Sequence, residues 1–202
     1  MPDTPLVAHS LAEAYLYLMA TPCAACGKGL LKGEDARPIE GDRDPMVVSI
    51  AVACGACDAR EEYRFELPQG LGTDPNGGPA VVNPTDEPSK AIDVAQWITL
   101  FRMIAEAAAK ETDKVEARRL GLESAQCLEE ALKFYDDADN DLPPSEAFFH
   151  ATSRERLAKT PEQFSRQRLI ELRAKLPTIA VMRSHAATEH KPRKRRWWRR
   201  RR

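Results

Sequence analysis

The chain has 202 residues, 43% of them hydrophobic, with 30 basic and 31 acidic residues and a formal net charge of −1 at pH 7. This length allows one domain, or a small domain joined to a larger one, and the composition is typical of a soluble globular protein. The apolar run at residues 14–20 is too short to span a bilayer and has no basic region before it, which argues against a membrane span or a targeting segment. We therefore expect a cytosolic protein.

The near-neutral total hides an uneven distribution of charge. Residues 191–202 contain nine Lys or Arg and no acid, which leaves 21 basic against 31 acidic residues before them. Opposite charges of this size attract each other, so the tail is free to fold back on the acidic body unless a stronger anion competes.

The first predicted element is a helix over residues 11–20. Ser10 and Glu13 have the spacing of a capping box, and Thr21 followed by Pro22 ends the helix. His9 precedes this cap, and we expect it on the surface.

Two CxxC pairs follow, Cys23 with Cys26 and Cys54 with Cys57. A spacing of three lets one tight turn point both thiolates inward, and two such turns complete a tetrahedral site for one Zn²⁺. A site filled by four protein ligands has no position for an activated water, so we expect one structural zinc ion per chain. A disulfide pair or a thioredoxin-like redox pair is the alternative, but Pro22 and the absence of a βαβ pattern argue against it.

The residues around the second pair predict a β-hairpin. Residues 46–53 are rich in Val and Ile, and residues 60–67 alternate, with Tyr63, Phe65 and Leu67 on one face. A hairpin capped by CxxC turns, the first followed by Gly27, resembles the zinc-ribbon family over the N-terminal part of the chain. That resemblance implies a metal-held β-hairpin and supplies no activity. Asp58 departs from its pattern, because a Gly often follows the second pair.

Residues 68–89 contain five Pro and four Gly and predict a linker or long loop. Helical periodicity then predicts a helix over residues 91–110 and a second one from Asp113 to about Tyr135, which together form an antiparallel hairpin. Cys127 lies within the second helix, and we expect it in the core. Further helices are predicted over residues 153–159 and from Thr160 to Pro177, the latter with Pro161 at its first position.

The sequence thus predicts an α+β fold: a helix and four-cysteine zinc ribbon in residues 1–67, a linker in 68–89, an α-helical domain in 90–177 and a disordered basic tail in 178–202. Over the whole chain the arrangement resembles bacterial zinc-ribbon proteins that carry a helical half. A resemblance of that kind implies no particular chemistry.

The end of the tail is the second candidate site, because Arg neutralises phosphates and Trp stacks on unpaired bases or lies at a lipid interface. Its candidate anion-binding residues are Arg193, Lys194, Arg195, Arg196, Trp197, Trp198, Arg199, Arg200, Arg201 and Arg202. An unstructured charged end without a partner, contact with RNA or single-stranded DNA, and binding to an anionic membrane surface all fit this composition.

The sequence contains no HExxH, GxSxG or comparable catalytic arrangement, and its four histidines are scattered. We therefore expect a non-enzymatic binding or adaptor protein, with structural zinc in the ribbon and a helical region that contacts a protein partner. The alternatives are a nucleic-acid-binding protein that uses the tail and a CxxC thiol-redox protein.

Overall fold

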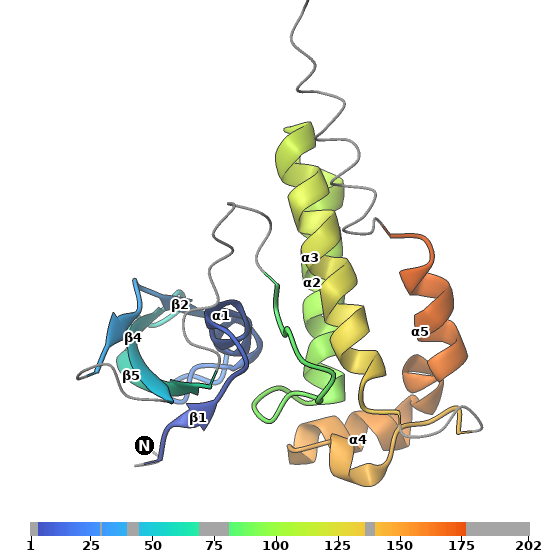
Figure 1. Cartoon of the computed structure of the whole chain (residues 1–202), viewed down its shortest axis with the longest axis horizontal. Helices are drawn as coiled ribbons and strands as arrows, with labels where there is room; N and C mark the ends of the chain where they lie inside the picture. Colours follow the sequence, from blue (N-terminus) through green and yellow to red (C-terminus); the bar gives the residue numbers. More distant parts are fainter. Residues whose placement is uncertain (1–3, 29, 40–44, 69–80, 136–139, 177–202) are drawn as a thin grey trace, which may run out of the picture.

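A computed structural model describes residues 4–28, 30–39, 45–68, 81–135 and 140–176. Within these residues the chain forms a small mixed sheet and a set of helices, which is the α+β architecture that the sequence predicts. Figure 1 shows the elements side by side: the sheet, then α1, then the pair α2 and α3, then α5, with α4 crossing below. The candidate tail residues 193–202 lie outside the described residues.

The sheet is built around the predicted β-hairpin of β4 (Met46–Cys54) and β5 (Arg60–Leu67). The two strands are antiparallel and in register from Met46 opposite Leu67 to Ala53 opposite Arg60. Phe65 and Leu67 are buried, and Tyr63 on the same face is partly buried, as the alternation predicts.

Three short strands complete the sheet. β1 (Leu6–Val7) pairs with β5 in parallel, and both β2 (Leu31–Gly33) and β3 (Arg37–Pro38) pair with β4 in antiparallel fashion. Gly33 permits close contact with α1, because a Cβ there would lie 2.9 Å from Cε1 of Tyr15.

Helix α1 (Leu11–Ala20) has the predicted bounds, but its cap differs in detail from the predicted box. The Ser10 hydroxyl accepts a hydrogen bond from the backbone N–H of Glu13, as expected. The Glu13 carboxylate accepts from the backbone N–H of His9 rather than from that of Ser10. The prediction of a surface histidine is therefore wrong, because His9 is only 6% exposed. The Glu13 carboxylate contacts both its backbone N–H and its ring Nδ1.

Helices α2 (Val94–Lys110) and α3 (Lys114–Leu132) form the predicted antiparallel hairpin. Helix α2 begins three residues later than predicted, because Asp93 and Gln96 form a complete capping box there. Cys127 of α3 is fully buried, which confirms its predicted place in the core.

The last predicted helix is in fact two elements. A 3-10 turn η1 (Ser145–Ala147) and helix α4 (Ala151–Lys159) precede a second 3-10 turn, η2 (Pro161–Phe164), and helix α5 (Arg166–Arg173). The prediction of one continuous helix from Thr160 fails because its hydroxyl does not cap a helix; it donates to the carbonyl of Arg156. Ser165 caps α5 instead, and Asp141 accepts hydrogen bonds from its hydroxyl and from the N–H of Gln167.

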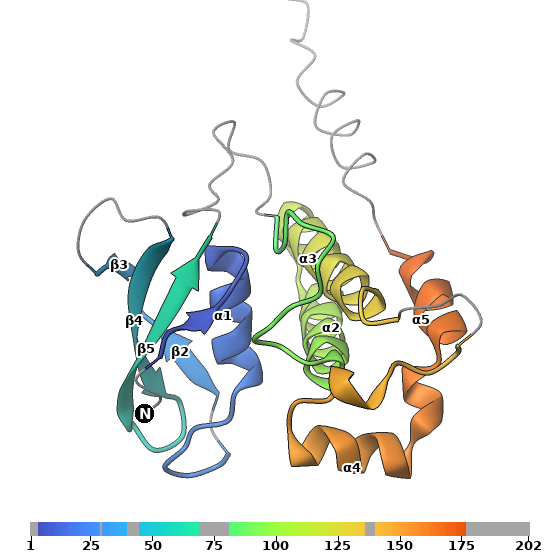
Figure 2. The same cartoon turned by 60° about the horizontal axis from the view of Figure 1, so that its bottom comes forward.

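Helix α1 lies between the sheet and the pair of helices α2 and α3 (Figure 2), and it contributes side chains to two hydrophobic cores. We call described residues up to 68 the ribbon half and residues 81–176 the helical half. Ala14 and Leu18 belong to the core under the sheet, while Leu16 belongs to the core of the helical half. The segment that begins at residue 81 also packs where the two halves meet, which we call the joint. Val82 is 2% exposed, and its carbonyl accepts a hydrogen bond from the Ser10 hydroxyl. None of the described helices is both long enough and apolar enough to cross a membrane.

Candidate metal centre

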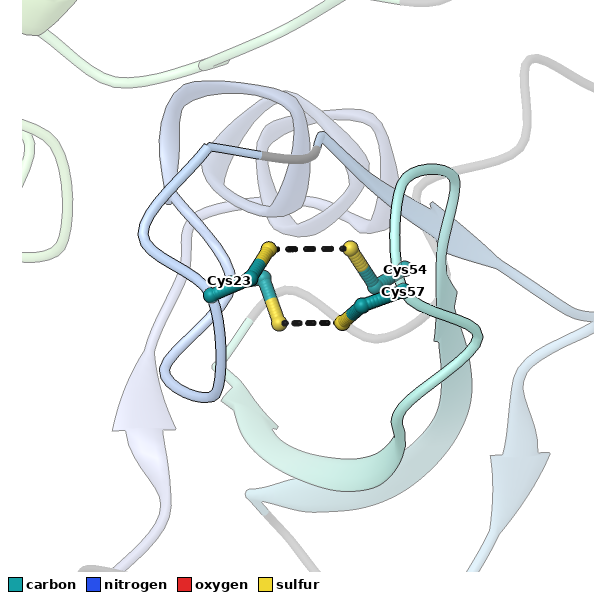
Figure 3. A group of neighbouring side chains, drawn as sticks. Cys23, Cys54 and Cys57 are labelled. Atoms are coloured by element: carbon teal, nitrogen blue, oxygen red, sulfur yellow. Dashed lines mark hydrogen bonds between the residues drawn. The ribbon is translucent and has the colours of Figure 1, made fainter.

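The four predicted cysteines come together at one end of the sheet (Figure 3). Cys23 and Cys26 lie in the turn after α1, while Cys54 ends β4 and Cys57 lies in the turn before β5. All four Sγ atoms lie within 4.8 Å of one another. In the described residues, this is the one group of three or more potential His, Cys, Asp or Glu ligands arranged closely enough to hold a metal ion.

Two sulfur contacts join one CxxC turn to the other. The Sγ atoms of Cys23 and Cys57 are 3.8 Å apart, and those of Cys26 and Cys54 are 3.7 Å apart. Four thiolates arranged as a tetrahedron around one ion, with metal–sulfur bonds of about 2.3 Å, would be about 3.8 Å from one another. The sulfur positions therefore fit a single metal ion held by four cysteines.

The same spacings bear on the disulfide alternative. A disulfide bond has a length of about 2.05 Å, so no disulfide joins Cys23 to Cys57 or Cys26 to Cys54. All five cysteines are free thiols in the structure. In the described part of the chain neither CxxC pair opens a helix, which is the position where a helix N-terminus lowers the pKa of a redox-active thiol.

The two CxxC turns share one backbone hydrogen bond and one residue with positive φ. In each, the residue after the second cysteine donates its N–H to the carbonyl of the first: Gly27 to Cys23 at 2.7 Å and Asp58 to Cys54 at 3.1 Å. Gly27 has φ +66° and Asp58 has φ +57°. Asp tolerates this left-handed region better than most residues, so the departure from Gly at position 58 preserves the turn at a modest conformational cost.

Gly55 has a different part in the second turn. Its φ is not positive, and a Cβ there would make only ordinary contacts, the nearest 3.6 Å from the side chain of Lys32. Its N–H donates to the carbonyl of Leu30 at 3.1 Å, which ties the second turn to the segment after the first. The N–H of Ala56 donates to Sγ of Cys54 at 3.3 Å and would stabilise a thiolate there.

The burial of the ligands is graded. Cys23 and Cys54 are buried, Cys26 is intermediate and Cys57 is exposed. One side of the site therefore rests on the core under the sheet, while the other faces solvent.

Cys127 lies in the other core and takes no part in this site. Burial raises the pKa of its thiol above the ordinary value, which disfavours the thiolate that metal binding and nucleophilic attack both need.

The sequence interpretation missed a buried polar cluster at the joint between the two halves. Glu13 of α1 is fully buried; its Oε2 accepts from His9, whereas its Oε1 has no hydrogen-bond partner among the described residues. Glu130 of α3 is 4% exposed and is held by Lys133 at 2.8 Å and by the amide of Asn83 at 2.9 Å. Burial raises the pKa of Glu130 to about 7, and the nearby Glu13 adds to the increase. Only the acid in the middle of an otherwise apolar α1 face signalled this cluster.

No protein-family model, curated protein or solved structure matched the chain. The chemistry of the site and the shape of the molecule are therefore the basis for a functional proposal.

Proposed function

We propose that this chain is a cytosolic, non-enzymatic zinc-ribbon adaptor, in which one structural Zn²⁺ ion holds the ribbon and the helical half contacts a protein partner. The observation that carries the metal part is the convergence of four Sγ atoms from two CxxC turns to within 4.8 Å of one another.

The chemistry of the ligands favours zinc. Tetrahedral sites of four thiolates select Zn²⁺ or iron–sulfur chemistry, and sulfur separations of 3.7 and 3.8 Å fit a single ion. With four protein ligands, zinc keeps no open position for water, so its contribution is to folding rather than to catalysis.

The protein-interaction part is supported by an apolar hollow on the helical half. A cavity of ≈ 550 Å³ lies beside Phe134, Pro144 and Phe149, and Phe149 is 37% exposed despite its size. Charged residues, among them Glu87 and Lys90, also line it. An apolar centre with charged residues beside it is the usual composition of a protein-binding site.

Metal content is the direct test of the zinc proposal. We expect about one Zn²⁺ per chain in the purified protein, because a structural site of four cysteines holds a single ion, and thiols that react with a maleimide only after chelation. The variant Cys54→Ser should lose the ion, while Cys127→Ala, which removes a thiol outside the site, should keep it. Absence of bound metal together with a reversible disulfide within one CxxC pair would support the redox alternative instead.

The adaptor proposal needs a separate test. A photo-crosslinking amino acid at position 149 should capture a discrete partner in cells, and the same group at the exposed position 115 should not. Identical crosslinking patterns at both positions would argue against an interface at the hollow.

The Arg and Trp residues of the tail favour a second candidate, a protein that binds RNA or single-stranded DNA. We would compare the full chain with a truncation at residue 190 on labelled RNA and DNA across a salt series. Binding by the full chain alone, with a steep salt dependence, would support a phosphate-binding tail. Absence of binding to nucleic acid, with binding to anionic vesicles, would assign the tail to a membrane surface.

A further inference from the structure

A second cavity lies where the two halves of the molecule meet. Its volume is ≈ 490 Å³, within the range of small-molecule sites. Tyr17 and Pro22 line it from the ribbon half, and Gln96, Thr99, Ala151 and Arg156 line it from α2 and α4. In Figure 2, α4 crosses beneath α2 with its first turn toward α1, which is the side where this cavity lies.

Arg156 supplies the positive charge of the cavity wall. Its Nη1 donates to the hydroxyl of Thr99 at 2.7 Å and to the carbonyl of Ala95 at 3.3 Å, both of which are neutral acceptors. Its guanidinium lies 5.8 Å from the centroid of the Phe164 ring. Within the described residues, no carboxylate lies within ion-pair distance of this guanidinium.

The surroundings leave this charge only partly compensated. Burial and the neighbouring Arg102 lower the pKa of Arg156. The guanidinium nevertheless stays charged, because Arg is not deprotonated in proteins. The acid that opposes this effect is Asp93, and its two oxygens already accept from the N–H groups of Gln96 and Phe149. A half-buried guanidinium in such a place gains from an added anion.

The rest of the cavity wall sets the remaining chemistry of an occupant. Gln96 accepts from the N–H of Asp93 through its Oε1, which leaves its amide NH₂ as a donor. The ring of Tyr17 and the side chains of Pro22 and Ala151 give the cavity an apolar part. Donors at one place and apolar walls at another suit a molecule with a carboxylate on a small apolar body.

We propose that this cavity binds a small organic acid, with its carboxylate at Arg156 and its apolar body against Tyr17 and Pro22. This inference is independent of the adaptor proposal, because it involves neither the hollow beside Phe149 nor the tail. An occupant would contact both halves at once and so favour their present arrangement.

Amide chemical shifts of the metal-loaded full chain provide the test, with benzoate as the probe and benzamide as a neutral probe of the same size, at constant pH and ionic strength. We expect benzoate to shift the amides of residues 20, 21 and 151–156 in a saturable way. Benzamide, which lacks the charge, should bind about tenfold more weakly or worse.

Two variants separate the cation from the cavity. Arg156→Met keeps a long apolar side chain but removes the charge, and should weaken benzoate binding at least about tenfold while leaving that of benzamide nearly unchanged. Because this variant also loses the bonds to α2, Ala151→Phe provides an independent check: Ala151 is exposed and lines the cavity, so a ring there should block both probes without unfolding the protein. Arg168→Met, on the exposed face of α5, is the matched control and should change nothing.

Equal affinity for benzoate and benzamide would overturn the proposal, as would saturable benzoate binding that Ala151→Phe leaves intact. Shifts confined to residues 191–202 would overturn it as well. So would the absence of a saturable shift at the amides of residues 20, 21 and 151–156.

Discussion

The two halves of this molecule obtain their stability in different ways. The ribbon half has a small sheet and a core of mainly small and aliphatic side chains, such as Val48 and Ile50, and its four cysteines gather at one end. The helical half buries Trp97, Phe148 and Phe164 completely or nearly so. We infer from this comparison that the proposed metal ion stabilises the ribbon half, whereas the helical half depends on the burial of large apolar side chains.

Loss of the metal should have the largest effect, and it should act on one half only. Binding of structural zinc contributes about 10–16 kcal/mol in small zinc domains, so its removal by a chelator, or the variant Cys26→Ser, should unfold the ribbon. Hydrogen exchange would show loss of amide protection in β4 and β5, with protection retained in α2 and α3.

Cys127→Ala is the control for this experiment, because it removes a cysteine from the other core. Protected β4 and β5 amides in metal-free protein would contradict the proposed difference between the halves.

The reverse experiment breaks the helical half. Trp97 is fully buried, and Trp97→Ala should lower the free energy of unfolding of this half by about 3–5 kcal/mol, because it leaves a large cavity. Chemical denaturation followed by circular dichroism would measure the loss, and the zinc content should remain at one ion per chain.

Val115 offers the matched comparison on α3, since it is 70% exposed and Val115→Ala should change stability by less than about 0.5 kcal/mol. If Trp97→Ala released its metal at the same denaturant concentration at which its helices unfold, the two halves would unfold as one unit.

The hairpin of β4 and β5 and the cysteine set could be predicted from the sequence, because both depend on local rules: alternation of two residues along a strand and a spacing of three in a metal-binding turn. The chain direction at Ser165 could not. There, Asp141 accepts hydrogen bonds from the Ser165 hydroxyl and the Gln167 N–H at the start of α5, and Asp141 is distant from both in the sequence.

The sequence also did not reveal the joint. His9, Glu13 and Glu130 are buried where α1 packs between the two cores, and the one local signal, an acid within the apolar helix α1, does not identify its partners. For the same reason, the cavity at Arg156 depends on how α4 crosses α2.

Titration of the joint would sharpen the comparison. The pKa of Glu130 is about 7 in the folded protein and near 4.5 when unfolded, so the folded state binds more protons between these values. Stability should therefore fall as pH rises from about 4.5 through 7, by on the order of 3 kcal/mol in total.

Thermal denaturation of Glu130→Gln between about pH 5.5 and 8 should show a flatter profile than that of the parent protein. Glu123→Gln, which removes a more exposed acid paired with Arg119 on the same helix, serves as the control. An unchanged slope in Glu130→Gln would mean that Lys133 and Asn83 keep this acid ionised throughout the range.

The smallest expected effect concerns the two CxxC turns themselves. Asp58 has φ +57° where the equivalent turn has Gly27, so Asp58→Gly should stabilise the ribbon by about 0.5–1 kcal/mol through relief of backbone strain. Gly27→Ala should destabilise it by a similar amount. Apparent zinc affinity, measured by competition with a chelator, would report both changes, and changes of the same sign would contradict the equivalence of the turns.

Helix α1 has a practical consequence for work on either half alone. Its Leu16 side chain is 3% exposed only because the helical half covers it, and Tyr17 and Met19 pack on the same side. A ribbon expressed alone as residues 1–67 would present this strip to solvent, even with its metal in place. Such a fragment should self-associate, and on the ribosome the same strip stays uncovered until α2 has been synthesised.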